Sequence, residues 1–199
     1  MYDRDMTMPL DAMNDVPDEA LLVLFANGER AAARALTLRL SPRVLAHAYR
    51  LLGNRTEAED VAQEALLRLW RVAPDWRQGE AKVTTWLYRV VANLCTDRLR
   101  RGWRQRPLEA AGDPADDRTS AAEDMQERAR VDALQEALQS LPERQRQAVV
   151  LRHIDELGNP EIAEIMEISV DAVESLTARG KRALSDVLRG RKDELGYAE

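Results

Sequence analysis

The chain has 199 residues, a formal net charge of −6, 5% aromatic residues, one cysteine and two histidines. This length is enough for one or two domains, and abundant Ala, Leu, Arg and Glu favour an all-α fold. The lone cysteine excludes an internal disulfide, and so few histidines disfavour a zinc site, so we expect no metal and no cofactor. Without an apolar run of about 18 residues or a signal segment, we expect a cytoplasmic protein with no direct membrane insertion.

The N-terminal quarter predicts a tail followed by three short amphipathic helices. Residues 1–17 lack hydrophobic periodicity and are expected to form a flexible tail. The first helix begins after Pro17, the second spans 31–40 and the third begins at Pro42. His47 lies beside the apolar stripe of the third helix. With no partner visible in the sequence, we interpret it as a packing or surface residue.

Residues 57–72, EAEDVAQEALLRLWRV, form the strongest helical signal in the chain, and Thr56 is the predicted N-cap. The predicted buried face comprises Ala58, Val61, Ala62, Ala65, Leu66, Leu69 and Trp70. The opposite face comprises Asp60, Gln63, Glu64, Leu67, Arg68 and Arg71. A solvated surface would explain these charges, but the exposed leucine among them is unusual.

A polar turn at 74–82 carries Trp76 and precedes a long helix over 83–101. Cys95 lies in the apolar stripe of that helix, so we interpret it as a core residue. The exposed stripe comprises Trp86, Arg89, Asn93, Asp97, Arg100 and Arg104. Arginines neutralise phosphates and aromatic rings stack on bases, so this mixture favours a nucleic-acid surface over a merely solvated one.

Residues 107–127 are polar and strongly acidic and contain two prolines. This composition predicts a flexible acidic linker between two small helical domains, 18–106 and 128–199. In the second domain, one helix ends before Pro142 and another begins there, and we interpret its His153 as structural.

A helix-turn-helix pattern completes the second domain. A short helix begins at Pro160, and Ser169 caps a second helix over 170–188. The predicted buried residues of this second helix are Val170, Val173, Leu176, Ala183 and Leu184. The outward residues are Asp171, Glu174, Ser175, Ala178, Arg179, Lys181 and Arg182. The basic outward face favours DNA binding over a purely structural helical hairpin.

Four segments in this order resemble the extracytoplasmic-function (ECF) sigma factors, the small promoter-specificity subunits of bacterial RNA polymerase. They are EAEDVAQEALLRLW, TTWLYRVVANLCTDRLRR, LPERQRQAVVLRHID and EIAEIMEISVDAVESLTARGKRAL. The resemblance covers most of 20–188. It implies that 18–106 is sigma region 2 and that 128–199 is sigma region 4.

The resemblance also implies partners and roles. The partners are core RNA polymerase, through its β′ clamp and β flap, promoter DNA and a separate anti-sigma factor. The implied core polymerase-binding residues are Asp60, Gln63, Glu64 and Arg68. For recognising and melting the minus-ten element, the implied residues are Trp76, Trp86, Asn93, Asp97, Arg100 and Arg101. For the minus-thirty-five element, they are Asp171, Glu174, Ser175, Ala178, Arg179, Lys181 and Arg182.

The chain departs from the family pattern at three places. Leu66 replaces a usual aromatic residue, Gly-Asn-Pro before the helix-turn-helix replaces Ser-Tyr-x-Glu, and the recognition helix carries Glu174. The Glu174 carboxylate can accept a hydrogen bond from a cytosine amino group.

A stand-alone helix-turn-helix regulator that binds operator DNA as a dimer remains the alternative, although the first domain shows neither a dimerisation face nor a sensing domain. An enzyme is disfavoured because no Ser/His/Asp set, Cys/His pair or phosphate-binding glycine loop is visible.

Overall fold

The structure is a computed structural model that describes residues 13–77, 79, 81–105 and 122–191. Its helices are α1 (Asp18–Ala26), α2 (Arg30–Leu52), α3 (Arg55–Val72), the 3-10 turn η2 (Ala73–Asp75), α4 (Val83–Gln105), α5 (Ala122–Gln139), α6 (Glu143–His153), α7 (Asn159–Met166) and α8 (Val170–Arg189). The predicted all-α fold is confirmed. None of the helices in these ranges is long and apolar enough to cross a membrane. The predicted tail before residue 13 and linker residues 107–121 lie outside the described residues.

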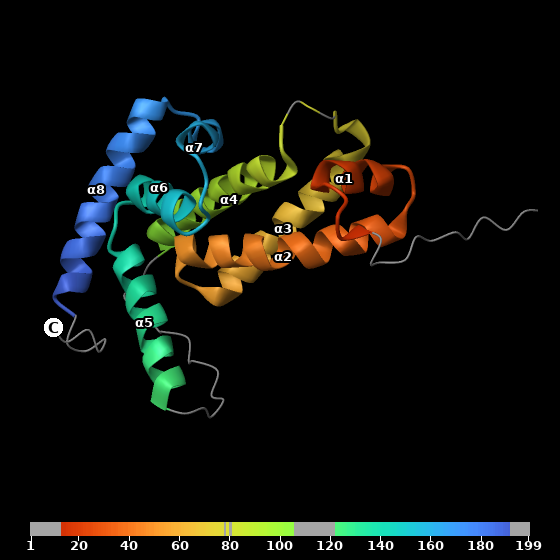
Figure 1. Ribbon diagram of the computed structural model, residues 1–199. Helices are drawn as coiled ribbons and strands as arrows, with labels where there is room; N and C mark the ends of the chain where they lie inside the picture. The colour runs from red at the N-terminus through yellow and green to blue at the C-terminus, as the bar shows by residue number, and fades with distance from the viewer. Residues whose placement is uncertain (1–12, 78, 80, 106–121, 192–199) are drawn as a thin grey trace, which may run out of the picture.

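Figure 1 shows α1, α2 and α3 on one side of the molecule, α6, α7 and α8 on the other, and α4 between them. In the first helical domain, α2, α3 and α4 pack on one another. The predicted inward residues Val61 and Leu69 of α3 and Leu87 and Val91 of α4 are fully buried there. Helix α5 begins at 122, six residues before the predicted start of the second domain, so 122–127 are helical rather than linker.

The predicted break between two helices at Pro42 is wrong, because α2 continues through it. Proline has no amide N–H to donate to the carbonyl of Leu38 one turn earlier, which normally disfavours the helix interior. Pro42 and Leu38 lie on the exposed side of α2, whereas Leu40 and Val44 on either side of the proline are buried. Burial of this apolar stripe therefore overrides the local penalty.

The predicted N-cap of α3 is also wrong. Gly53, with a left-handed φ of 72°, ends α2, and Asn54 takes the N-cap position. The Oδ1 atom of Asn54 accepts a hydrogen bond from the backbone N–H of Glu57 at 2.9 Å. Thr56 lies inside the first turn of α3, since the helix begins at Arg55.

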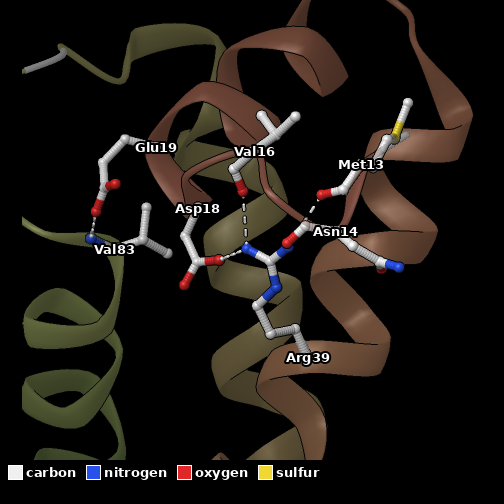
Figure 2. Close-up of polar contacts among 7 residues, drawn as sticks. All are labelled: Met13, Asn14, Val16, Asp18, Glu19, Arg39 and Val83. Atoms are coloured by element: carbon white, nitrogen blue, oxygen red, sulfur yellow. Dashed lines mark hydrogen bonds and ion pairs between the residues drawn. The ribbon is translucent and has the colours of Figure 1, made fainter. Parts of the chain in front are cut away.

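Arg39 on α2 holds the segment before α1 in place (Figure 2). Its guanidinium bonds to the Asp18 carboxylate and to the backbone carbonyl oxygens of Met13, Asn14 and Val16. One residue further, the carboxylate of Glu19 accepts from the backbone N–H of Val83 at 3.0 Å. The first N–H groups of a helix have no partner within it, so α1 supplies one for α4 and fixes where α4 begins.

In the second domain, α8 packs against α6 and α7. A Cβ atom at Gly180 would lie 2.6 Å from Cγ2 of Val149, so this glycine permits the close approach of α8 to α6. The predicted cap is confirmed, because Ser169 Oγ accepts from the N–H of Ala172 at 3.2 Å. Val170 was predicted to be buried, but it is 39% exposed. It is the first residue of α8.

Three second-domain side chains cap the C-terminal end of α2. The last carbonyl groups of a helix lack partners within it. Gln135, Gln139 and Arg146 donate hydrogen bonds to the carbonyl oxygens of Tyr49, Arg50 and Leu51, respectively. Arg146 is only 7% exposed, and its burial lowers the pKa of its guanidinium. The two domains are therefore in polar as well as apolar contact.

Candidate polymerase- and DNA-binding surfaces

The polar face of α3 is exposed as predicted, with Asp60, Gln63 and Arg68 at the surface and Glu64 half-buried. Arg68 Nε donates to Glu64 Oε1 at 2.8 Å, and this hydrogen bond lowers the pKa of the Glu64 carboxyl. Leu67 is 43% exposed beside this pair. An exposed leucine flanked by an amide and ordered charges can make both apolar and polar contacts with a partner helix.

Asp60 also connects the α3 face to α4. Its Oδ2 atom lies 3.4 Å from Nη1 of Arg98, with both side chains partly exposed. Arg98 is not among the residues of the exposed stripe predicted for α4. Its position next to Asp60 follows from the packing of α3 against α4, which no local pattern in the sequence indicates.

The two tryptophans predicted for the minus-ten element lie together at the start of α4. The rings of Trp76 and Trp86 meet edge to face, with centroids 6.1 Å apart and planes inclined by 86°. Both are half-buried, and Nε1 of Trp76 is buried with no hydrogen-bond partner in the described part of the chain. This pair joins the loop after η2 to α4 and leaves part of each ring accessible for stacking.

The other minus-ten candidates continue along α4. Asn93, Asp97 and Arg100 follow Trp86 at helical spacing, and all three are exposed, as is Arg101. The surface therefore combines aromatic edges, an amide, a carboxylate and guanidinium groups. Amides and carboxylates can hydrogen-bond to the edges of unpaired bases, and guanidinium groups bind phosphates.

The minus-thirty-five candidates all lie on the exposed side of α8. They are Asp171, Glu174, Ser175, Ala178, Arg179, Lys181 and Arg182. Glu174 is held by Asn159 at the start of α7, whose Nδ2 atom donates to its carboxylate at 3.3 Å. Arg179 Nε donates to the carbonyl oxygen of Ser175 at 3.1 Å. The carboxylate near the helix N-terminus can accept a hydrogen bond from a cytosine amino group, and the basic side chains that follow can bind phosphates.

Cys95 and His153 lie outside these surfaces. Cys95 is buried as predicted, and burial raises the pKa of its thiol to about 12, so the thiol is protonated near neutral pH. His153, interpreted as structural, has an exposed side chain at the end of α6. Partial burial, then Lys181 and Arg152, lower the pKa of His153. Within the ranges that the structure covers, no three His, Cys, Asp or Glu side chains gather as metal ligands.

Comparison with known proteins identifies both helical domains. Residues 36–105 match Sigma-70 region 2, and residues 132–184 match Sigma-70 region 4. The chain is 37% identical over 151 residues to the ECF RNA polymerase sigma factor SigW of Bacillus subtilis, covering 71% of this chain and 80% of SigW. It is 36% identical to SigE of Mycolicibacterium smegmatis, covering 86% of this chain and 68% of SigE.

Solved structures agree on the fold. CnrH, solved in complex with the cytosolic domain of CnrY, superposes with a TM-score of 0.64 at 27% identity, covering 87% of this chain and 97% of CnrH. The sigma factor RpoE of Bartonella quintana, at 21% identity and a TM-score of 0.63, shares the fold over 77% of this chain and 94% of RpoE. With region 2 followed by region 4 on this all-helical fold, and with relatives of this identity and coverage, the chain belongs to the ECF sigma factors of RNA polymerase.

Proposed function

We propose that the chain binds core RNA polymerase through the polar face of α3 and directs transcription initiation at specific promoters. The observation that carries this proposal is that one chain has three separate accessible surfaces. They are Asp60, Gln63 and Arg68 on α3, the half-buried Trp76–Trp86 pair with Asn93, Asp97, Arg100 and Arg101 on α4, and the outward face of α8. A stand-alone regulator needs only the last of these.

Each surface has a proposed contact. The α3 face binds the β′ clamp, and the second domain lies against the β flap. The α4 stripe with the tryptophan pair melts the minus-ten element and holds a base that leaves the stack, where aromatic stacking offsets the cost of unstacking. The outward face of α8 enters the major groove of the minus-thirty-five element, with Glu174 reading a base and Arg179, Lys181 and Arg182 near phosphates.

Control by a separate anti-sigma factor in the cytoplasm completes the proposal. The support is family membership, together with RpoE of Bartonella quintana, which was solved with the anti-sigma factor NepR. Because its action is to position polymerase and open DNA, the chain needs no catalytic group of its own.

The test is in vitro transcription with bacterial core polymerase and a genomic DNA library, with and without the protein. New transcripts that start at defined sites are expected, and their upstream sequences give the promoter motif. A pull-down with core enzyme accompanies the assay. Failure to bind core enzyme would overturn the proposal and favour the stand-alone regulator.

A further inference from the structure

The basic edge of α4, defined as Lys82 and Arg89, adjoins the proposed minus-ten surface. Arg89 lies one turn after Trp86 and one turn before Asn93 on the same side of α4. Lys82 directly precedes the helix, and its carbonyl oxygen accepts from the N–H of Trp86 at 3.1 Å. Two cations beside a stacking residue and an amide have the chemistry that holds the phosphates of a single strand.

In this structure the second domain places carboxylates beside the basic edge. They come from Glu161 and Glu164, which share one side of α7, and from Glu167, the residue directly after the helix; we call these three residues the acidic stripe of α7. Their nearest oxygens lie 3.6 Å from Lys82 Nζ for Glu161, 3.7 Å from Arg89 Nη2 for Glu164 and 3.9 Å from Arg89 Nε for Glu167.

Shorter hydrogen bonds fix this contact between α4 and α7. Arg89 Nη2 donates to the backbone carbonyl oxygen of Glu164 at 2.8 Å. The hydroxyl of Thr85, which is buried, donates to Glu161 Oε1 at 2.8 Å. A carboxylate and a phosphate are both anionic, so the Glu164 and Glu167 carboxylates offer the Arg89 guanidinium the same charge that a DNA strand would. Arg89 Nε is buried without a hydrogen-bond partner in the described part of the chain, so the guanidinium keeps a donor for a phosphate.

The contact belongs to a larger interface in which polar groups of the two domains are buried against one another. Arg146 is buried against the carbonyl oxygen of Leu51 in α2. His47, also buried, places Nδ1 at 2.6 Å from Oδ2 of Asp155. Buried polar atoms tend to be hydrogen-bonded, so these pairings select one arrangement of the domains, in which α7 lies on the basic edge.

We propose that Lys82 and Arg89 form a phosphate-binding edge of the minus-ten surface, and that the acidic stripe of α7 occupies this edge in the free protein as an internal competitor of the DNA strand. The inference rests on the proposed function and adds a means of regulating the same surface. When only a fraction of the molecules is in the binding-competent form, the apparent affinity for the ligand is lowered in proportion to that fraction. Weakening the α7 contact therefore increases the affinity of the free protein for single-stranded DNA.

The first test measures that increase. The full chain, with Glu164→Gln and Glu167→Gln together, is titrated into fluorescein-labelled oligothymidylate of about 20 nucleotides, and binding is followed by fluorescence anisotropy at low salt. Affinity is expected to rise about three- to tenfold, because exposed ion pairs are individually weak and two are removed. Circular dichroism confirms that each variant is folded.

A matched control separates competition from the change in net charge. Glu57→Gln with Asp132→Asn removes two exposed carboxylates from α3 and α5 and changes the net charge by the same amount. Its affinity for the oligothymidylate is expected to change by less than about twofold. Equal affinity in the wild type, the α7 variant and the control, or an equal gain in both variants, would overturn the competitor role.

The second test asks whether Arg89 contacts phosphate once α7 is weakened. Adding Arg89→Gln to the α7 variant is expected to reduce the slope of log K against log salt by about 0.7, the value for one phosphate contact on a single strand. Arg55→Gln, at an exposed arginine on α3, is the control in the same background. A slope that Arg89→Gln leaves unchanged would remove the basic edge from the DNA surface.

A pull-down with core polymerase distinguishes the two proposals. Wild type and α7 variant are both expected to be retained, because neither substitution lies on the α3 face. Retention of both without any difference in oligothymidylate affinity would overturn this inference and leave the proposed function intact. Loss of retention by the wild type would overturn the proposed function, whatever the anisotropy shows.

Discussion

His47 on α2 and Asp155, two residues after the end of α6, meet in the interface between the two domains, although they are 108 positions apart in the sequence. Nδ1 of His47 lies 2.6 Å from Oδ2 of Asp155, and the ring of Tyr88 packs edge to face on the imidazole at 4.8 Å. This hydrogen bond links an imidazole nitrogen to a carboxylate oxygen across the domain interface. His47 has no solvent exposure, and the pair therefore joins the domains through buried atoms.

Removing the acceptor is expected to weaken this junction. Asp155→Ala leaves Nδ1 of the buried His47 without its hydrogen-bond partner, which costs about 1–3 kcal/mol in the free energy of unfolding. Urea denaturation followed by circular dichroism measures this cost, and small-angle scattering reports whether the domains separate. Asp132→Ala, at an exposed position on α5, is the control. Equal stability of the two variants would show that the pair contributes nothing to the packed arrangement.

The polar face of α3 is expected to determine the affinity for core polymerase. Replacing Asp60 and Gln63 by alanine is expected to weaken binding to core enzyme by about tenfold or more, because central polar contacts of an interface carry much of its energy. Both side chains are exposed, so helix content should not change. Competition with a labelled sigma factor measures the affinity. Glu59→Ala, an exposed acid on the same helix, should bind as the wild type does, and unchanged binding by the Asp60 and Gln63 variant would exclude this face.

The basic residues of α8 are expected to make the affinity for promoter DNA depend on salt concentration. Single alanine substitutions at Arg179, Lys181 and Arg182 are each expected to reduce the slope of log K against log salt for duplex promoter DNA by about 0.9 wherever the residue contacts a phosphate. Binding of the polymerase complex at several salt concentrations measures the slope. Arg43→Ala, at an exposed position on α2, serves as the control. A residue whose removal leaves the slope unchanged lies outside the DNA interface.

The burial of Cys95 is expected to affect the stability of the protein at high pH and the reactivity of the thiol. Burial raises the pKa of its thiol from 9.0 to about 12, so the folded state favours the protonated form. The stabilisation is fully present below pH 9 and is lost as pH rises toward 12, since the unfolded thiol ionises first. At pH 8 the thiol should react with iodoacetamide at least about a hundredfold more slowly in the native protein than in denaturant, because the thiolate is the nucleophile. Comparable rates would place Cys95 in contact with solvent.

Helical periodicity and capping chemistry determined much of this protein from the sequence alone. The buried and exposed faces of α3, the burial of Cys95 and the Ser169 cap of α8 all follow from residues within a few positions of one another. Side chains three and four residues apart share a helix face, so a local pattern is sufficient to assign it. For the same reason, the sequence alone assigned the family, since its motifs lie within single helices.

Only the tertiary structure decided how separate elements meet. Pro42 lies inside α2 because the burial of apolar residues before and after it outweighs one missing hydrogen bond. Helix propensity is a property of single residues and does not include this burial. The partners of His47 and Arg89 lie in the other domain. Because the linker separates the two members of each pair in the sequence, no helical periodicity indicates that they meet. Such contacts depend on how helices pack across the interface, and packing is a property of whole surfaces rather than of any one segment.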